Sequence, residues 1–85
     1  MLEKKTVVDR IEIDEDGNVG VRLGLLIVDG ANELARKWHR TIIRNGASVA
    51  AQMAAVNVHL GTMGENVVDA AAVARIAAIA AVAKV

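Results

Sequence analysis

The chain lacks cysteine, proline, phenylalanine and tyrosine, and Trp38 is its only residue of the Phe, Tyr and Trp class. Without cysteine the protein forms no disulfide and has no thiolate metal site, so two common ways of stabilising a small fold are excluded. An excess of charge is also missing, because ten basic side chains balance ten acidic ones. A balanced chain has no long-range field that would attract a polyanion.

The length of 85 residues predicts a single domain over residues 1–85, near the lower limit for independent folding. Apolar residues make up 54% of the chain, but many of them are alanine, which buries little area. A monomeric core would therefore be thin, and small domains often gain the missing buried surface from a partner. We expect an oligomer, with a compact monomer as the alternative.

Export and membrane signals are also missing. The first five residues, Met1–Lys5, have no apolar run after their charges, so we expect no signal peptide. The segment Val67–Val85 is apolar, but it contains Asp69, Arg75 and Lys84 and is dominated by alanine. A membrane-spanning helix needs about 20 strongly apolar residues, so we expect no membrane span.

The first half of the chain alternates polar and apolar residues, as β-strands do. Thr6–Asp14 predicts a strand with Val7, Ile11 and Ile13 on one face and Asp9 as an exception. The segment Asp14–Asn18, which begins with three acidic residues, then predicts a turn, with Gly17 free to adopt a positive φ.

A second strand follows this turn. Its predicted inner face is Val19, Val21, Leu23, Leu25 and Ile27. Residues 25–28 are all apolar, which predicts that this end of the strand is covered on both faces.

Residues 32–44 allow two interpretations. Leu34, Trp38 and Ile42 share a face in a strand, but helical spacing also fits, with Asn32 as a cap. Because an isolated two-stranded hairpin is marginally stable, we predict a third strand over Leu34–Arg44.

After Gly46 the apolar spacing becomes helical. Ser48 is a good N-cap for a helix that ends near Gly61 and Gly64, and its predicted apolar stripe is Val49, Met53, Val56, Leu60 and Met63. Asn66 is the predicted cap of a second helix over about residues 67–84, with Asp69 in its first turn. The predicted fold is α+β: a three-stranded antiparallel meander over about residues 6–44, followed by two helices over about residues 48–84.

The sequence contains no catalytic or metal-binding constellation. His39 and His59 lie on different predicted elements, whereas a metal site needs three or four ligands. The acidic residues Asp14–Asp16 lack the spacing of a calcium loop, and the single serine, Ser48, has no histidine or aspartate beside it. We therefore expect no enzyme, no cofactor and no metal.

The strongest candidate site is a basic strip formed by Arg36, Lys37, Arg40 and Arg44, with Trp38 among them. One strand face would show three arginines beside the indole, an arrangement that could hold nucleic-acid phosphates. Alternatively, these arginines pair across strands with Glu12 or Asp14, or contact an acidic partner. We disfavour nucleic acid because the net charge is zero and only one aromatic ring is present.

The second helix is apolar on nearly all sides, and helices of this kind are usually buried on all sides. An 85-residue chain cannot cover such a helix alone, so we expect it to pack against copies of itself or against another protein. The predicted partner-binding residues are Arg36, Trp38, Arg40, Arg44, Leu26, Val28, Ile76, Ile79 and Val82.

Three segments occur here in a familiar order: Thr6–Ile13, Val19–Leu23 and Trp38–Thr41, before an alanine-rich ending that follows Asn45-Gly46. Together they resemble small structural-module proteins of tailed bacteriophages, which are often encoded beside tail-fibre genes. The resemblance covers most of the chain and rests on overall pattern. It implies a virion component that is assembled in the host cytoplasm, and it assigns no functional residues.

The predicted function is therefore structural: a tail, tail-fibre or baseplate protein that acts by associating with itself or with a larger phage protein. Two alternatives remain open. One is a small nucleic-acid-binding or regulatory module that uses the strip Arg36–Arg44. The other is a cement or decoration protein of the capsid.

Overall fold

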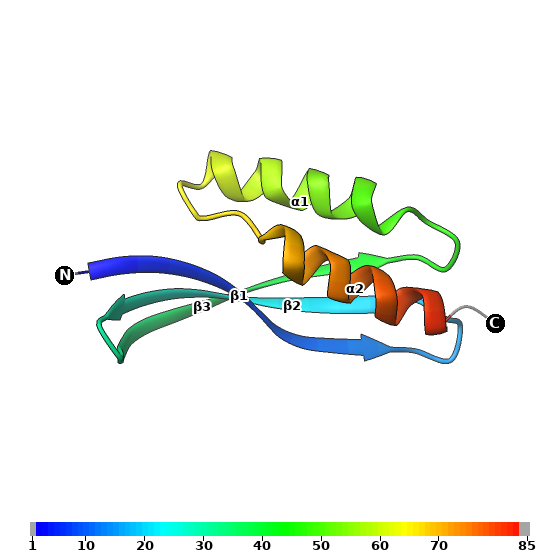
Figure 1. The fold of residues 1–85 in the computed structure, drawn as a ribbon, viewed down its shortest axis with the longest axis horizontal. Coiled ribbons are helices and arrows are strands. Elements are labelled where there is room, and N and C mark those ends of the chain that lie inside the picture. Colours follow the sequence, from blue (N-terminus) through cyan, green and yellow to red (C-terminus); the bar gives the residue numbers. More distant parts are fainter. Residues whose placement is uncertain (1, 84–85) are drawn as a thin grey trace.

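A computed structural model describes residues 2–83 as one sheet layer and one helical layer (Figure 1). The elements are β1 (Leu2–Ile13), β2 (Val19–Asp29), β3 (Asn32–Ile43), α1 (Val49–Thr62) and α2 (Ala70–Ala83). The strands form an antiparallel sheet in the order β1-β2-β3. The predicted meander followed by two helices is confirmed, and residues 32–43 are a strand.

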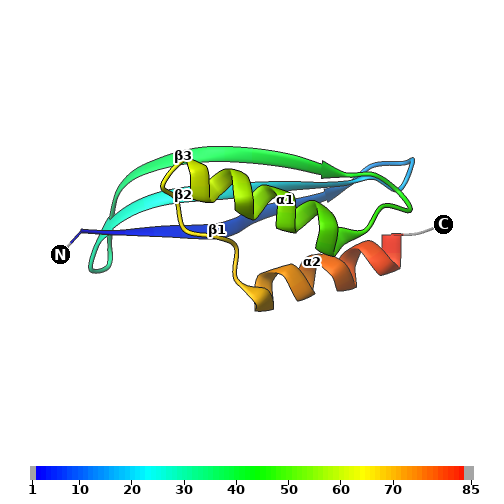
Figure 2. The ribbon, with the colours of Figure 1, turned by 90° about the horizontal axis from the view of Figure 1, so that it is seen from above.

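Both helices lie on the same face of the sheet (Figure 2). The core forms between this face and the helices, and its most deeply buried members include Leu23 of β2, Met53 and Leu60 of α1, and Ile76 of α2. The predicted inner face of β2 is correct from Val19 to Leu25, because alternate strand residues point to one side. No helix in the described part of the chain is long and apolar enough to cross a membrane.

A β-bulge at Asp9 shifts the register of β1. Val8 lies opposite Leu23, but the next pair is Arg10 with Arg22, so Asp9 is the extra residue. The predicted face of β1 is therefore wrong in part. Val7, paired with Gly24, lies on the face opposite the helices, whereas Val8 and Ile11 pack against the core.

The turns and caps follow the predicted chemistry, with one exception. Asp14 accepts hydrogen bonds from the backbone of Asp16 and Asn18, and Gly17 adopts φ 82°. The Oγ of Ser48 accepts a hydrogen bond from the N–H of Ala51, as an N-cap does.

The exception is the start of α2, where Asn66 is not the cap. The Asn66 amide donates to the carbonyl of Lys4 on β1 at 2.6 Å and so ties the interhelical loop to the sheet. The carboxylate of Asp69 accepts from the N–H of Ala72 at 2.7 Å, and α2 begins one residue after it. The predicted start at residue 67 was therefore three residues early.

The molecule is elongated, with principal extents of 45 × 22 × 19 Å. Its radius of gyration is 13.5 Å, compared with about 12 Å expected for a compact domain of this length. A strand rises about 3.3 Å per residue and a helix about 1.5 Å, so the strands extend further in space than the helices. The β2–β3 hairpin therefore projects beyond the ends of the helices (Figure 1). The protein therefore exposes more surface than a compact domain of equal size.

Candidate binding surface on the open face of the sheet

The sheet face turned away from both helices is here called the open face (Figure 2). Its residues come from all three strands and are the register partners of Gly20, Arg22, Gly24 and Leu26 on β2. Two large apolar side chains on this face are exposed: Trp38 by 49% and Ile42 by 62%. The open face thus combines exposed apolar groups with all four arginines of the strands.

Three arginines lie side by side across the open face, and we call them the arginine row. The strand register places Arg10 of β1 opposite Arg22 of β2, and Arg22 opposite Arg40 of β3. Directly opposite residues in a sheet are about 5 Å apart at Cβ, and like charges in such positions destabilise it. The fold therefore needs nearby acidic groups to offset this repulsion.

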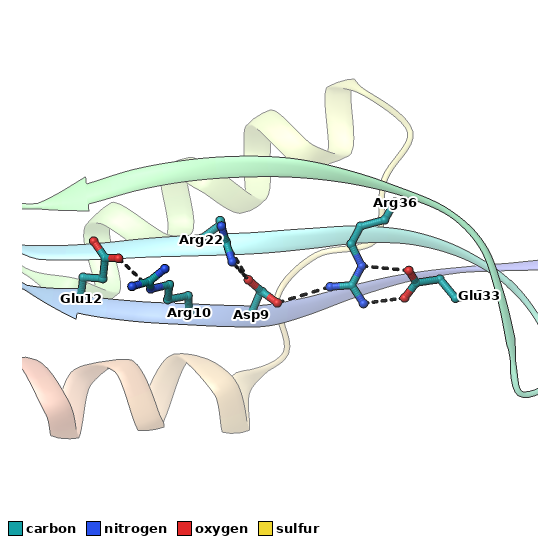
Figure 3. Close-up of polar contacts among 6 residues, drawn as sticks. All are labelled: Asp9, Arg10, Glu12, Arg22, Glu33 and Arg36. Carbon is teal, nitrogen blue, oxygen red and sulfur yellow. Dashed lines mark hydrogen bonds and ion pairs between the residues drawn. The ribbon is translucent and has the colours of Figure 1, made fainter.

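Asp9 supplies part of that compensation because the bulge brings its carboxylate to the open face. Arg22 Nε donates to Asp9 Oδ2 at 2.7 Å, and Arg36 Nη1 lies 3.3 Å from Asp9 Oδ1 (Figure 3). All three side chains are more than two-thirds buried, so this contact is better shielded than an ordinary surface ion pair. One carboxylate therefore holds two arginines from two other strands.

Glu33 holds Arg36 from its other side. Arg36 Nε donates to Glu33 Oε2 at 3.1 Å, and Arg36 Nη2 donates to Glu33 Oε1 at 2.5 Å, which is a two-bond contact. These hydrogen bonds lower the pKa of Glu33 and raise the pKa of Arg36, since each favours the charged form. At the other end of the sheet, Arg10 Nε contacts Glu12 Oε1 at 2.7 Å, with both side chains 60% exposed.

Trp38 lies between these charged groups. The guanidinium carbons of Arg22 and Arg36 are 4.4 and 4.9 Å from the centre of its ring, within cation–π range. Gly24, directly opposite Trp38, makes room for this arrangement. A Cβ on Gly24 would lie 3.3 Å from Arg36 Nη1 and 3.2 Å from a methyl group of Val7.

A hollow of about 160 Å³ lies beside the arginine row, over Gly20. Gly20 has no side chain to fill the space between its register partners Glu12 and Ile42. The lining residues are Arg10, Glu12, Gly20, Val21, Arg22, Arg40, Thr41 and Ile42. All members of the arginine row therefore border one shallow site.

The predicted basic strip is divided in the structure. Trp38, Arg36 and Arg40 share the open face, as predicted, because their partners Gly24, Leu26 and Arg22 alternate along β2. Arg44 lies beyond the end of β3 and is exposed. The predicted pairing with Glu12 or Asp14 is wrong for Arg36, which binds Asp9 and Glu33 instead.

Leu26 and Val28, which the sequence assigned to partner contact, are only 8% and 7% exposed. They occupy the open face at the β2–β3 end, and neither belongs to the main core. The expectation that residues 25–28 are covered on both sides is met only in part, because Ile27, predicted on the inner face, is 36% exposed and lies outside the core. The helix-facing core contains Leu25, whereas Leu26 is buried on a face that carries no helix.

The three predicted partner residues on α2 differ in accessibility. Ile76 is fully buried inside this chain, so it has no surface to offer a partner while the fold is intact. Ile79 is partly buried, and Val82 is 84% exposed.

The two histidines are closer than the sequence indicated. The rings of His39 on β3 and His59 on α1 have centroids 5.4 Å apart. No group of three or more potential metal ligands occurs among residues 2–83. Asp14 uses its carboxylate inside the β1–β2 turn, where the backbone hydrogen bond from Asn18 lowers its pKa most.

Sequence reasoning missed Asp9, Arg10, Arg22 and Gly20 as parts of one surface. The Asp14–Asn18 turn carried a usable signal, because pairing Ile13 with Val19 places Arg10 opposite Arg22. The β2–β3 register has a second irregularity, between Ile27 and Val28. Regular pairing from the β2–β3 turn would place His39 opposite Arg22, and the shift of one residue places Arg40 there instead. Comparison with known protein families, curated proteins and solved structures found no match for this chain.

Proposed function

We propose that this protein is a structural component of a tailed bacteriophage particle and that it works by protein–protein association. The resemblance noted in the sequence supports the phage assignment. The observation that carries the association is the outward side of α1 and α2, here called the helical outer surface. Its exposed members include Ala54, Val58, Ala74, Ala78 and Val82.

The helical outer surface is almost free of charge. Arg75 is the only Lys, Arg, Asp or Glu within α1 and α2, and Val58 and Val82 are 70% and 84% exposed. Two such surfaces can meet without burying ionised groups, which avoids the main cost of forming an interface. Alanine side chains also let two helical layers approach closely. A second copy of this chain is therefore the partner that we propose for this surface.

The exposed area supports the same proposal. The protein exposes 5424 Å², whereas a compact monomer of this mass exposes about 4,800 Å². A stable interface buries about 800 Å² on each partner. Association would bring the buried fraction of this small chain closer to that of a larger domain.

The test is light scattering coupled to gel filtration at micromolar concentrations. We expect a mass of at least two chains for the unchanged protein. The double variant Val58→Glu, Val82→Glu should run as a folded monomer, because each new carboxylate would be buried in the interface. Ile76 is unsuitable for this test, since replacing a fully buried side chain would disrupt the core.

Ile42→Glu is the matched control, because Ile42 is 62% exposed but lies on the opposite face. This variant should keep the oligomeric mass. A monomeric unchanged protein would refute the association. An oligomer that survives the double variant but dissociates in Ile42→Glu would refute the helical contact. The particle assignment has its own test: mass spectrometry of purified virions from a phage that encodes this chain should detect its peptides.

A further inference from the structure

We propose that the arginine row and the hollow over Gly20 form a binding site for a single phosphate group. This site lies on the open face, away from the helical outer surface, so it does not depend on the association proposed above. The inference rests on the row of like charges, on the unused donors of Arg10 and Arg40 and on the size of the hollow.

The arginine row costs stability in the unliganded protein. Arg10, Arg22 and Arg40 are register partners, so three positive charges lie next to one another across the sheet. The acidic groups nearby compensate only part of this charge. Asp9 is shared between Arg22 and Arg36, and Glu12 makes a solvent-exposed contact with Arg10. An anion that binds the guanidinium groups of Arg10 and Arg40 would offset the charge that remains uncompensated.

The row also has hydrogen-bond donors to spare. A guanidinium group carries five N–H donors, and Arg10 contacts Glu12 through Nε. Within residues 2–83 Arg40 makes no ion pair or side-chain hydrogen bond. Its side chain borders the hollow together with Arg10 and Arg22. The guanidinium group of Arg22 is already engaged by Asp9 and lies over Trp38, so the free donors at the hollow are those of Arg10 on β1 and Arg40 on β3.

The size of the hollow limits the ligand to one small group. Sites for drug-sized molecules enclose about 300–1,000 Å³, whereas this hollow measures about 160 Å³. The lining carries three arginines and one glutamate, and Asp9 pairs with Arg22, so the net charge is 3 − 2 = +1. This positive charge favours an anion. Guanidinium groups bind phosphate oxygens through paired hydrogen bonds, and one phosphate group has enough oxygens to accept from Arg10 and Arg40 together.

The test is an NMR titration of the full chain with sodium phosphate at pH 7 and constant ionic strength. We expect saturable shifts confined to the Gly20 amide and to the Nε–H signals of the arginine row. Arg40→Gln should weaken binding about tenfold, because it removes charge-assisted hydrogen bonds. Gly20→Val should also weaken binding, since its side chain would occupy the hollow. Both variants are checked for folding by circular dichroism.

The matched control is Arg75→Gln on α2, which removes the same charge from the other layer. It should bind phosphate as the unchanged protein does. Equal weakening by this control would overturn the proposal. The absence of a saturable shift up to about 50 mM phosphate would also overturn it, because a site of millimolar affinity is saturated at that concentration. Arg40→Gln also guards against a folding artefact, because Arg40 has no partner in the described structure to lose.

Two further titrations identify the source of the phosphate. An oligothymidylate that shifts the same signals, and loses this effect in Arg40→Gln, would assign the site to a phosphodiester of nucleic acid. Binding of free phosphate without the oligonucleotide would assign it to a free phosphate or a monoester; either result supports the site. Binding of a polyglutamate peptide to the row in the absence of any phosphate binding would refute the phosphate class.

Discussion

Two glycines on β2 should respond in opposite ways to the same substitution. Gly20 and Gly24 share the open face, and neither has a positive φ. A Cβ on Gly20 would meet only the Glu12 carbonyl oxygen, at 3.9 Å, which is ordinary contact. A Cβ on Gly24 would lie 3.2 Å from Val7 and 3.3 Å from Arg36 Nη1, so these neighbours must move.

The magnitudes follow from these contacts. Replacing glycine by alanine within a strand stabilises by about 0.5–1 kcal/mol when the space is free, so Gly20→Ala should gain this amount. Gly24→Ala has the same gain, but crowding typically costs about 1–3 kcal/mol. It also displaces Arg36 from Asp9 and Trp38. We therefore expect Gly24→Ala to be about 1–3 kcal/mol less stable than Gly20→Ala.

Urea unfolding measures this difference, followed by circular dichroism and by the fluorescence of Trp38. With a slope of about 1 kcal/mol per molar urea for so small a chain, the two midpoints should differ by about 1–3 M. Fluorescence of the folded state should change in Gly24→Ala alone, since Arg36 lies 4.9 Å from the indole centre. Equal midpoints, or a more stable Gly24→Ala, would refute the packing argument.

Three other outcomes follow from the polar contacts. Asp9→Ala should destabilise the fold by about 1–2 kcal/mol in urea unfolding, because two partly buried arginines lose their shared carboxylate; an unchanged midpoint would contradict this. Acid should weaken the fold through Asp14 and Glu33, whose folded-state pKa values lie below the ordinary 3.8 and 4.5. A carboxylate with a lowered pKa stabilises the fold at any pH above its ordinary pKa, and this stabilisation is lost as the pH falls through the folded-state pKa. In thermal melts, Asp14→Asn should therefore lose less stability on acidification than the unchanged protein does. Affinity for inorganic phosphate should rise from pH 5 to pH 8 as the dianion forms, because the second ionisation of inorganic phosphate falls near neutral pH. Sulfate is a dianion throughout this range, so a parallel rise for sulfate would point to titration of the protein instead.

Local signals in the sequence predicted the elements well. The alternation in Val19–Leu25, the acidic turn before it and the Ser48 cap are short-range features, and each is present in the structure. The third strand was predictable because two strands alone would be marginal. These features depend on neighbouring residues, so no knowledge of distant contacts was needed.

The surface was less predictable because it depends on register. The bulge at Asp9 reverses the face of Val7, and no residue near Asp9 marks a bulge in the way that glycine often does. The cap of α2 was assigned to Asn66 because asparagine is a good cap. In the structure that side chain instead binds the backbone of Lys4, a residue 62 positions away in the chain. Such long-range contacts compete with local preference and leave no local trace.

The bulge at Asp9 also has a consequence for the tolerance of β1 to changes in length. Without Asp9, Val8 and Arg10 become neighbours in the chain and still lie opposite Leu23 and Arg22, so the pairing becomes regular and the other residues of β1 keep their faces. The main loss is then the Asp9 carboxylate. Deleting a residue from the regular part of the strand, such as Thr6, would instead turn residues 2–5 to the opposite sides of the sheet or slide them by one position. A single-codon deletion should therefore be far better tolerated at Asp9 than at Thr6.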